Sequence, residues 1–567
     1  MRKLWLILPV LITFFVQEIC AQVIPDDDLL RREVSYYGQA RIIIGNPGIR
    51  KTAELSEIVS VTSVKDDIVR ITLSPLTVEW FILQDIDYRI VERHDCKSDF
   101  TASDTREAME WEKYPTYTQY DSIMRSFASH YPTLCRLDTI GKSIYGKLVM
   151  ALKISDNVSS DEDEPEVFYS SSIHGDETGG FILMLRLADY LLKNHDTDSR
   201  VRNLVNNLEI WINPLANPDG TYRTGNTLTS PTRYNANGYD LNRNFPDPET
   251  PNTTKQKETL DMVRFMRNHN FVISANFHAG EEVVNYPWDR WYRRHVDDEW
   301  FFHISRKYAD TAHLHSPSGY LDAFDNGVTN GYDWYKINGG RQDFITYELQ
   351  GREVTIELDY SYVTPATELK TLWESNWRSL IGYLENATFG IHGKVKDGLT
   401  GAAVPARVFI SGHDKDSSHV YSDMLTGSFV RMLAPGIWDL TFSAPGYVEK
   451  TVENIVVSAD QKTEMVVEMI PILSPVDTMS TPVPLVYPNP AGEYIKMVLP
   501  AHQIVNVNIA IYNSMGLKLT DYNTVTYEDT PVLFYLDKFP GGVYSIIITN
   551  SDTKIRNICR FVVTKGN

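Results

Sequence analysis

The sequence contains little cysteine and no apolar segment long enough to span a membrane. Four cysteines among 567 residues are too few for a scaffold held together by many disulfides. The apolar run from Leu4 to Val16 is too short for a transmembrane helix, and no later run reaches the roughly 18 apolar residues that one requires. Basic residues are also in deficit, with 54 Lys and Arg against 74 Asp and Glu and a net charge of −20. This charge argues against a nucleic-acid-binding protein, which would carry a basic surface.

The N-terminus is typical of a secretory signal peptide. Arg2 and Lys3 precede the apolar run, and Ile-Cys-Ala at 19–21 provides a cleavage site, so residues 1–21 are predicted to be removed. The exported chain would then keep three cysteines, an odd number that excludes complete pairing within one chain. A bridge between Cys96 and Cys135 and buried free thiols both remain open.

The sequence contains enough apolar residues to form the cores of several folded domains. Hydrophobic residues make up 43% of the chain and charged residues 23%, as in globular proteins, and the length suggests roughly four domains. Residues 22–112 are predicted to form a small α+β unit, with strands at 40–45 and 67–74 and helices at 52–60 and 78–84. Its role as a pro-segment, a chaperone or a packing domain is open.

The central part of the chain, residues 113–387, alternates strand and helix signals and is predicted to be an α/β domain. The clearest helix, 181–195, has apolar residues at helical spacing. The strongest predicted strands are 148–155, 166–174, 208–214, 271–278 and 353–360.

The remainder of the chain is predicted to be all-β. Residues 388–470 consist of short alternating strands between Gly and Pro turns, which predicts a β-sandwich. Residues 471–484 are rich in Pro, Ser and Thr and form a linker. Residues 485–567 again show short strands with turn signals, so we expect a second β-sandwich.

Four residues that could carry chemistry fall at or just beyond the ends of predicted strands. His174 and Glu177 follow one strand, and His278 ends another. Two histidines and one carboxylate would leave a zinc position open for water, as a hydrolytic site requires. Glu357 lies among β-branched residues, where burying a carboxylate is costly. Open α/β sheets bind ligands at the carboxyl ends of their strands, so the four are expected to converge.

Six segments then occur in a characteristic order: SSIHGDETGG, INPLANPDG, RYNANGYDLNRNFPD, ANFHAGEEVVNYPWD, GGRQDF and EVTIEL. In these segments the chain resembles the zinc metallocarboxypeptidases of the carboxypeptidase A/B superfamily, in particular the regulatory N/E/D-like branch. The resemblance implies a mixed-sheet α/β/α catalytic domain that holds one Zn²⁺ ion. It also implies hydrolysis of the C-terminal peptide bond of peptides and proteins.

The resemblance assigns the catalytic roles. His174, Glu177 and His278 correspond to the metal ligands of the family. Glu357 corresponds to the catalytic glutamate, and Arg233 to the arginine that polarises the scissile carbonyl.

The resemblance also assigns residues that bind substrate. Asn242 and Arg243 correspond to the pair that grips the terminal carboxylate, and Tyr347 to the mobile tyrosine that caps the substrate. Asp289 matches an acidic position that faces basic side chains, which implies a preference for C-terminal Lys or Arg. A solvated loop aspartate beside Arg290 is the open alternative.

The flanking domains resemble known modules as well. The sandwich at 388–470 follows the catalytic domain as a transthyretin-like domain does in the same branch. The segment 485–567 resembles the C-terminal sorting domain of type IX secretion substrates, through YPNP near its start and GGVYSIII near its end. We therefore expect type IX secretion machinery as a partner, and a protein released from the cell or anchored on its outer surface.

The sequence thus predicts a secreted zinc carboxypeptidase. One alternative is a zinc amidase that acts on cell-wall peptides or acylated amino acids. The joint presence of Arg233, Asn242, Arg243 and Tyr347 disfavours it, because an amidase need not keep them together. A second alternative is an inactive surface binding protein, which is disfavoured because the ligand set and Glu357 are all present.

Overall fold

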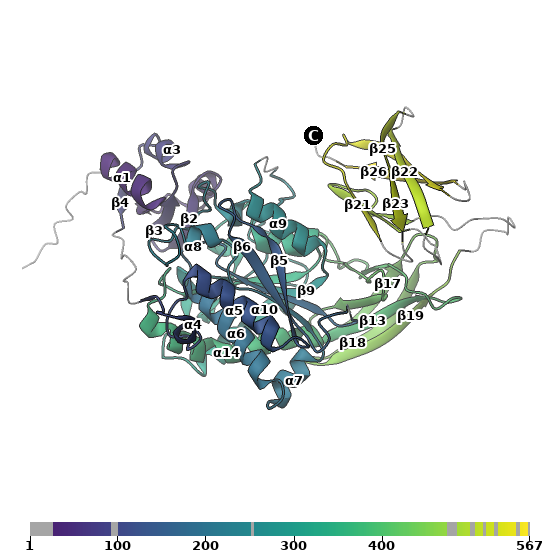
Figure 1. The fold of residues 1–567 in the computed structure, drawn as a ribbon, viewed down its shortest axis with the longest axis horizontal. Coiled ribbons are helices and arrows are strands. Elements are labelled where there is room, and N and C mark those ends of the chain that lie inside the picture. Colours follow the sequence, from purple (N-terminus) through teal and green to yellow (C-terminus); the bar gives the residue numbers. More distant parts are fainter. Residues whose placement is uncertain are drawn as a thin grey trace, which may run out of the picture. The chain divides into compact units, whose positions relative to one another are not determined.

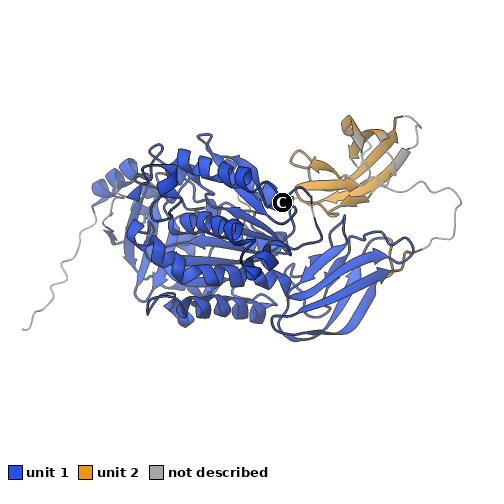
Figure 2. Ribbon diagram, turned by 60° about the horizontal axis from the view of Figure 1, so that its bottom comes forward, with its two compact units in different colours: residues 1–445, 449–469 blue, residues 446–448, 470–567 orange. Residues whose placement is uncertain are grey.

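The computed structural model describes residues 26–91, 100–160, 162–250, 254–472, 485–498, 505–513, 517–526, 531–551 and 556–564. The chain divides into two compact units, residues 1–445 with 449–469 and residues 446–448 with 470–567 (Figure 2). The predicted signal peptide, Cys96 and most of the predicted linker lie outside the described residues. Among the described helices, none has the length and apolar character that crossing a membrane requires.

The first unit begins with a four-stranded sheet in the order β2-β3-β1-β4 (Figure 1). Its elements are α1 (Asp27–Tyr37), β1 (Ala40–Gly45), α2 (Ile49–Ser56), β2 (Ser60–Lys65), β3 (Ile68–Leu73), α3 (Val78–Ile82) and β4 (Tyr88–Ile90). The sequence analysis did not predict β2, whose residues SVTSVK carry a weak strand signal. The register of β2 against β3 shifts between Val61 and Ser63, so Thr62 lies in a bulge.

An eight-stranded mixed sheet follows, in the order β11-β10-β12-β9-β7-β8-β6-β5. Its strands are β5 (Cys135–Lys142), β6 (Leu148–Ile154), β7 (Glu166–Ser171), β8 (Glu209–Asn213), β9 (Phe271–His278), β10 (Glu281–Tyr286), β11 (Val328–Asn330) and β12 (Arg352–Asp359). Strands β12, β9, β7 and β8 are parallel neighbours. Strand β12 is buried at every position, as expected for a parallel strand covered on both faces.

Helices pack on both faces of this sheet (Figure 1). One core joins the sheet to α5 (Tyr117–His130), α6 (Gly179–Asn194), α10 (Asp298–His313) and α14 (Leu369–Glu385). A second core joins it to α9 (Lys257–Arg267) and α13 (Arg341–Glu348). On β7, Val167 and Tyr169 face the first core and Phe168 faces the second, which is the alternation of a strand. The predicted α/β/α domain is therefore present.

Shorter helices connect these elements. They are α4 (Thr105–Ala108), α7 (Ser199–Val205), α8 (Pro218–Thr221), η2 (Leu241–Arg243), α11 (Ala323–Asn326), α12 (Gly331–Trp334), η3 (Ala366–Glu368) and η4 (Asn386–Thr388). Cys135 is buried on β5, and the predicted alternatives for its pairing with Cys96 stay open.

Two further pairs of sheets complete the chain. In the first unit, β13 (Gly390–Asp397), β16 (Ser428–Arg431) and β19 (Lys462–Met469) form one sheet. The facing sheet consists of β14 (Arg407–Phe409), β15 (Val420–Tyr421), β17 (Gly436–Ser443) and β18 (Lys450–Val457). The rings of Phe429 and Phe442 meet between the two, with centroids 5.5 Å apart. This is the architecture expected of a β-sandwich.

The second unit has the same plan. One sheet contains β20 (Leu485–Tyr487), β21 (Tyr494–Val498) and β24 (Val532–Tyr535). The other contains β22 (Val505–Asn513), β23 (Lys518–Thr526), β25 (Gly542–Asn550) and β26 (Arg556–Val563). A single core includes Ile495 from the first sheet and Ile509 and Ile546 from the second. The predicted fold class, an α/β domain with a small α+β unit and two β-sandwiches, is confirmed.

Candidate active site

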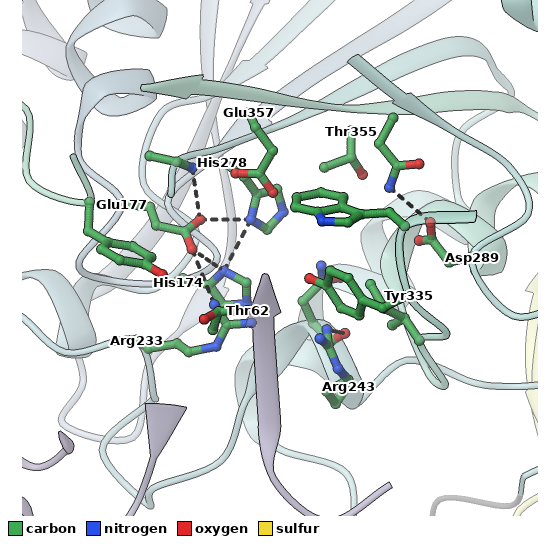
Figure 3. A pocket seen from close by; sticks show the side chains of 16 residues that line it. Thr62, His174, Glu177, Arg233, Arg243, His278, Asp289, Tyr335, Thr355 and Glu357 are labelled. Carbon is green, nitrogen blue, oxygen red and sulfur yellow. Dashed lines mark hydrogen bonds and ion pairs between the residues drawn. The ribbon is translucent and has the colours of Figure 1, made fainter. Parts of the chain in front are cut away.

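Three side chains with metal-binding atoms meet at the carboxyl edge of the large sheet. His174 and Glu177 follow β7, and His278 ends the neighbouring parallel strand β9. The two oxygens of Glu177 lie 2.7 Å from Nδ1 of His174 and 2.7 Å from Nδ1 of His278. One ligand atom from each residue lies within 4.8 Å of the others, and all three residues are buried. Figure 3 shows the three side chains pointing toward one another.

This donor set fits a zinc ion. Two imidazoles and one carboxylate are the ligands that zinc takes when a coordination position is kept open. Burial lowers the pKa of His278 to about 4, so its imidazole is neutral near pH 7 and can coordinate a metal. Nε2 of His174 lies 3.1 Å from Oδ1 of Asp240, and such a carboxylate orients a ligating histidine. The sequence analysis did not single out Asp240, although it stands two residues before Asn242 in the same motif.

The register of the central strands places Glu357 beside the cluster. Strand β12 pairs with β9 so that Glu357 is opposite His278. Its Oε2 is buried, and none of the described residues forms a hydrogen bond with that atom. Burial and the negative charge of Glu177 raise the pKa of Glu357 well above its usual value. A buried carboxyl group with an unpaired oxygen beside a candidate metal site is suited to general acid–base chemistry.

Arg233 contacts both Glu177 and Asp240. Its NH1 group donates to Oε1 of Glu177 at 3.2 Å, and its Nε donates to Oδ2 of Asp240 at 2.9 Å. Burial by itself would raise the pKa of Asp240, but Arg233 and His174 outweigh burial and hold that pKa well below its usual value. The guanidinium is therefore fixed in a buried, charged setting next to the candidate metal position.

Asn242 and Arg243 reach the same pocket from η2. The side-chain oxygen of Asn242 accepts a hydrogen bond from the backbone N–H of Arg341 at 2.9 Å. This contact leaves the amide hydrogens of Asn242 to donate to a ligand. The NH1 group of Arg243 donates to the carbonyl of Asn242 at 3.0 Å, which keeps its guanidinium at the pocket.

Asp289 is buried in the pocket, on the side away from Glu177 (Figure 3). Its Oδ1 accepts hydrogen bonds from Asn285 at 2.9 Å and Gln342 at 3.0 Å. Burial raises the pKa of Asp289 to about 6, although the hydrogen bond from Asn285 acts in the opposite direction. The alternative of a solvated loop aspartate is wrong.

Tyr347, the predicted mobile capping residue, is not among the residues that line this pocket. Tyr347 lies on α13, and its ring centroid is 5.4 Å from that of Trp291 and 6.3 Å from that of Trp288. Two tyrosines do line the pocket, Tyr335, just after α12 (Figure 3), and Tyr362. The position of Tyr335, in the segment that leads to GGRQDF, is the signal that could have identified it.

A strand of the N-terminal sheet also contributes to the pocket. The bulged Thr62 of β2 lines it (Figure 3), and the carbonyl of Val61 accepts a hydrogen bond from NH2 of Arg243 at 3.2 Å. Ser60 donates to Oδ2 of Asp240 at 2.6 Å. Strand β2 therefore contacts both the candidate carboxylate-binding arginine and the carboxylate that orients His174.

Residues 120–379 match the family model described as zinc carboxypeptidase. Residues 485–563 match the model described as secretion system C-terminal sorting domain. The second match confirms the predicted sorting domain at the C-terminus.

Curated relatives extend the first match. The chain is 33% identical to the carboxypeptidase N catalytic chain of Homo sapiens over 382 residues, which cover 59% of this chain and 81% of the relative. It is 32% identical to carboxypeptidase M of Mus musculus, covering 58% of this chain and 77% of the relative. Carboxypeptidase D of Homo sapiens is 35% identical over 61% of this chain, and the match spans only 26% of that longer protein.

Solved structures with low sequence identity also align. Thrombin activatable fibrinolysis inhibitor aligns over 62% of this chain and 98% of its own, with 16% identity and a TM-score of 0.49. The carboxypeptidase A from Helicoverpa armigera aligns over 62% of this chain and 97% of its own, with 17% identity and a TM-score of 0.48.

Proposed function

This chain belongs to the zinc carboxypeptidase family, and we propose that it is an exported enzyme that removes the C-terminal residue, preferably Lys or Arg, from peptides and proteins. The observation that carries the proposal is the convergence of two groups of side chains in one buried pocket. The ligand set of His174, Glu177 and His278 lies there together with Glu357, and with the carboxylate-binding candidates Asn242 and Arg243.

His174, Glu177 and His278 would hold one zinc ion. When bound there, zinc polarises a carbonyl oxygen and lowers the pKa of a coordinated water. Asp240 holds the ring of His174 in place through Nε2, and Arg233 is fixed by its contacts with Asp240 and Glu177. The cationic guanidinium of Arg233 would stabilise the negative charge that develops on the scissile carbonyl oxygen.

Glu357 would move the proton. Its Oε2 makes no hydrogen bond with any described residue and can accept a proton from the attacking water. The same carboxyl would then pass the proton to the amide nitrogen as the last peptide bond breaks.

Asn242 and Arg243 would make the enzyme an exopeptidase. An arginine guanidinium binds a planar carboxylate through two parallel hydrogen bonds. The contact of Asn242 with Arg341 uses only the side-chain oxygen of Asn242, so its NH2 group can donate to the same carboxylate. Recognition of the free C-terminus would position the last peptide bond at Glu357. Tyr335 lines the pocket and would contact the bound substrate, and Tyr347 stays the predicted mobile cap.

The buried carboxylate of Asp289 supports the preference for basic residues. A buried carboxylate needs a cationic partner, and Asn285 and Gln342 provide Asp289 only with neutral hydrogen bonds. The side chain of a C-terminal Lys or Arg would supply the missing charge.

The N-terminal sheet would have to withdraw before a peptide binds. The carbonyl of Val61 holds the guanidinium that would grip the substrate carboxylate, and Thr62 of the same strand lines the pocket. These contacts support a pro-segment-like role for residues 22–112. The predicted signal peptide and the sorting domain at 485–563 support export by the type IX route, followed by release or surface anchoring.

The proposal is tested with zinc-loaded full-length protein and peptides that end in Lys, Arg, Leu, Phe or Glu. The expected result is the loss of a single C-terminal Lys or Arg, read by mass spectrometry, with no reaction of the same peptides as C-terminal amides. Glu357→Gln protein is the matched control. If the full chain is inactive, the panel is repeated on protein that lacks residues 22–112.

Other outcomes separate the alternatives. Removal of apolar ends would keep the carboxypeptidase and refute the role of Asp289. Cleavage of cell-wall peptides or acylated amino acids alone would favour the amidase. No reaction of either protein with zinc bound would favour an inactive binding scaffold.

A further inference from the structure

The side chain of Asn217 links two segments of the active site that are far apart in the sequence. Asn217 stands just before α8 and is fully buried. Its NH2 group donates to the carbonyl of Ile173 at 3.2 Å and to the carbonyl of Arg233 at 3.3 Å, and its side-chain oxygen accepts from the backbone N–H of Gly220 at 3.0 Å. The two hydrogens of the amide are therefore shared between the residue before His174 and the arginine next to the candidate metal position.

The loop between β7 and α6, which carries His174 and Glu177, has a backbone that needs such support. Ser172 has a φ of 52°, a conformation that residues other than glycine rarely adopt. Strain of this kind persists only where the surrounding structure holds it. The backbone N–H of Asn217 donates to the carbonyl of Ser172 at 3.0 Å, and the hydroxyl of Ser172 donates to the carbonyl of Glu177 at 2.9 Å. Asn217 therefore restrains the ligand loop with its backbone as well as with its side chain.

The ligand loop also lies directly against α8. The N–H of Gly175 donates to the carbonyl of Arg233 at 3.3 Å, the same oxygen that Asn217 reaches. A Cβ atom added to Gly175 would lie 2.3 Å from the carbonyl carbon of Gly220, so the two backbones are in close contact. The amide of Asn217 holds both sides of this contact and thereby the spacing between His174 and Arg233.

We propose that Asn217 is a positioning residue that sets the spacing between the metal ligands and Arg233. The inference rests on the proposed carboxypeptidase function, in which zinc and the guanidinium of Arg233 act on the same carbonyl oxygen. Stabilisation of a developing charge requires groups that are held in place before the reaction, and a misplacement of about 1 Å can cost about 10²-fold in rate. The competing interpretation is a buried amide that only stabilises the fold.

The test compares Asn217→Asp with Asn213→Asp in the full-length chain. Asn213 on β8 is the matched control, because its side chain is also fully buried and its NH2 group donates to a carbonyl, that of Met150, at 2.7 Å. Each substitution keeps the shape of the side chain and replaces the NH2 group by an oxygen. The zinc dissociation constant is measured by competition with a chromophoric chelator, and kcat and KM are measured at saturating zinc with a peptide that ends in Lys.

Asn217→Asp is expected to weaken zinc binding about tenfold and to lower kcat about tenfold to a hundredfold, with little change in KM because Asn242 and Arg243 are untouched. Asn213→Asp is expected to lower the melting temperature by a similar amount and to leave the zinc constant and kcat at their wild-type values. An unchanged zinc constant or kcat in Asn217→Asp, or equal changes in both variants, would overturn the proposal. Asn217→Ala, which removes both donors without adding a charge, takes the place of Asn217→Asp if that variant fails to fold.

The failure of the proposed function can be told apart from the failure of this inference. If the wild type binds zinc but hydrolyses no peptide, the proposed function has failed and the zinc constants decide the inference alone. Weaker zinc binding by Asn217→Asp than by Asn213→Asp would then support the positioning role, and equal binding would overturn it. A folded wild type that takes up no zinc would overturn both.

Discussion

Two clusters of buried carboxylates in the first unit differ in how completely their charges are compensated. Around Asp297, arginine guanidinium groups donate to both carboxylate oxygens, with Arg431 reaching Oδ1 at 3.3 Å through NH2. Arg352 donates to Oδ2 at 2.8 Å, Arg431 donates to the same atom at 2.7 Å, and Nε2 of His413 lies 3.0 Å from Oδ1. In the active-site pocket, one oxygen of Glu357 makes no hydrogen bond with any described residue, and Asp289 has only neutral donors.

The difference appears in the pKa values. Burial by itself would raise the pKa of Asp297, but Arg431 and Arg352 outweigh it and hold the pKa well below its usual value. Burial raises the pKa of Glu357 well above its usual value, and raises that of Asp289 to about 6. The compensated carboxylate of Asp297 joins Arg431 of the β-sandwich to Arg352 of the catalytic domain. The uncompensated carboxylates of Glu357 and Asp289 lie where the enzyme would bind a proton or a substrate.

The largest expected effect is on catalysis at Glu357. Replacing Glu357 by Gln should lower kcat about 10²–10⁴-fold, the usual contribution of a general base. The melting temperature should stay the same or rise, because the substitution removes an uncompensated buried carboxyl. Steady-state kinetics and calorimetry on the same protein check both parts. A large loss of stability would mean that Glu357 is a structural residue like Asp297.

At Asp297 we expect a loss of stability rather than a direct loss of catalysis. Asp297→Ala should lower the free energy of unfolding by about 3–5 kcal/mol, because it leaves Arg352 and Arg431 buried without their anion. Asp416→Ala is the control, since the pair of Asp416 with Arg293 is partly exposed and should contribute less than about 1 kcal/mol. Denaturant unfolding measures both variants. Similar small losses would show that the Asp297 cluster does not hold the sandwich in place.

Asp289→Asn should remove the preference for basic ends. Relative to a peptide that ends in Leu, kcat/KM for a peptide that ends in Lys should fall about tenfold to a hundredfold, as expected when a buried charge pair worth about 2 kcal/mol is lost. The Leu peptide should react at nearly the wild-type rate. An unchanged ratio would remove Asp289 from substrate recognition.

The same preference should depend on pH. Asp289 is ionised above its pKa of about 6 and neutral below it, so the attraction for a cationic side chain is present above pH 6 and lost below it. The ratio of kcat/KM for Lys and Leu peptides should therefore decline as the pH falls from 7 to 5. In the Asp289→Asn variant the ratio should be flat, and a decline there would assign the titration to another group.

The smallest effect separates two tyrosines. Tyr335→Phe should lower kcat/KM about twofold to tenfold, the usual effect of losing one hydrogen bond to the substrate. Tyr347→Phe should leave kcat/KM unchanged, because Tyr347 contacts Trp288 and Trp291 outside the pocket. The reverse pattern would support the mobile cap assigned from the sequence.

The sequence could predict those parts of the site that depend on local strand patterns. His174, Glu177, His278 and Glu357 fall at the ends of strands whose apolar patterns are clear, and parallel strands bring those ends to one edge of the sheet. The sandwiches were predictable for the same reason, since short strands alternate with turn residues along 388–470 and 485–567.

The sequence could not predict contacts between segments far apart in the chain. Nothing in the patterns of the separate segments shows that Thr62 lines the active-site pocket, that Arg41 pairs with Asp176, or that Asp297 pairs with Arg431. Such pairings depend on how separate domains pack. The ring contacts of Tyr347 could not be predicted for a related reason, because α13 begins at Arg341 and directs that residue to Trp288 and Trp291.

The central claim is that His174, Glu177 and His278 hold one zinc ion, and metal analysis of the purified full-length chain tests it most directly. We predict one zinc per chain in the wild type and in Glu357→Gln, and almost none after Glu177→Gln or His278→Ala, with folding verified by calorimetry. Zinc that persists at one per chain in the two ligand variants, or a folded wild-type chain that takes up no zinc from excess metal, would contradict the account.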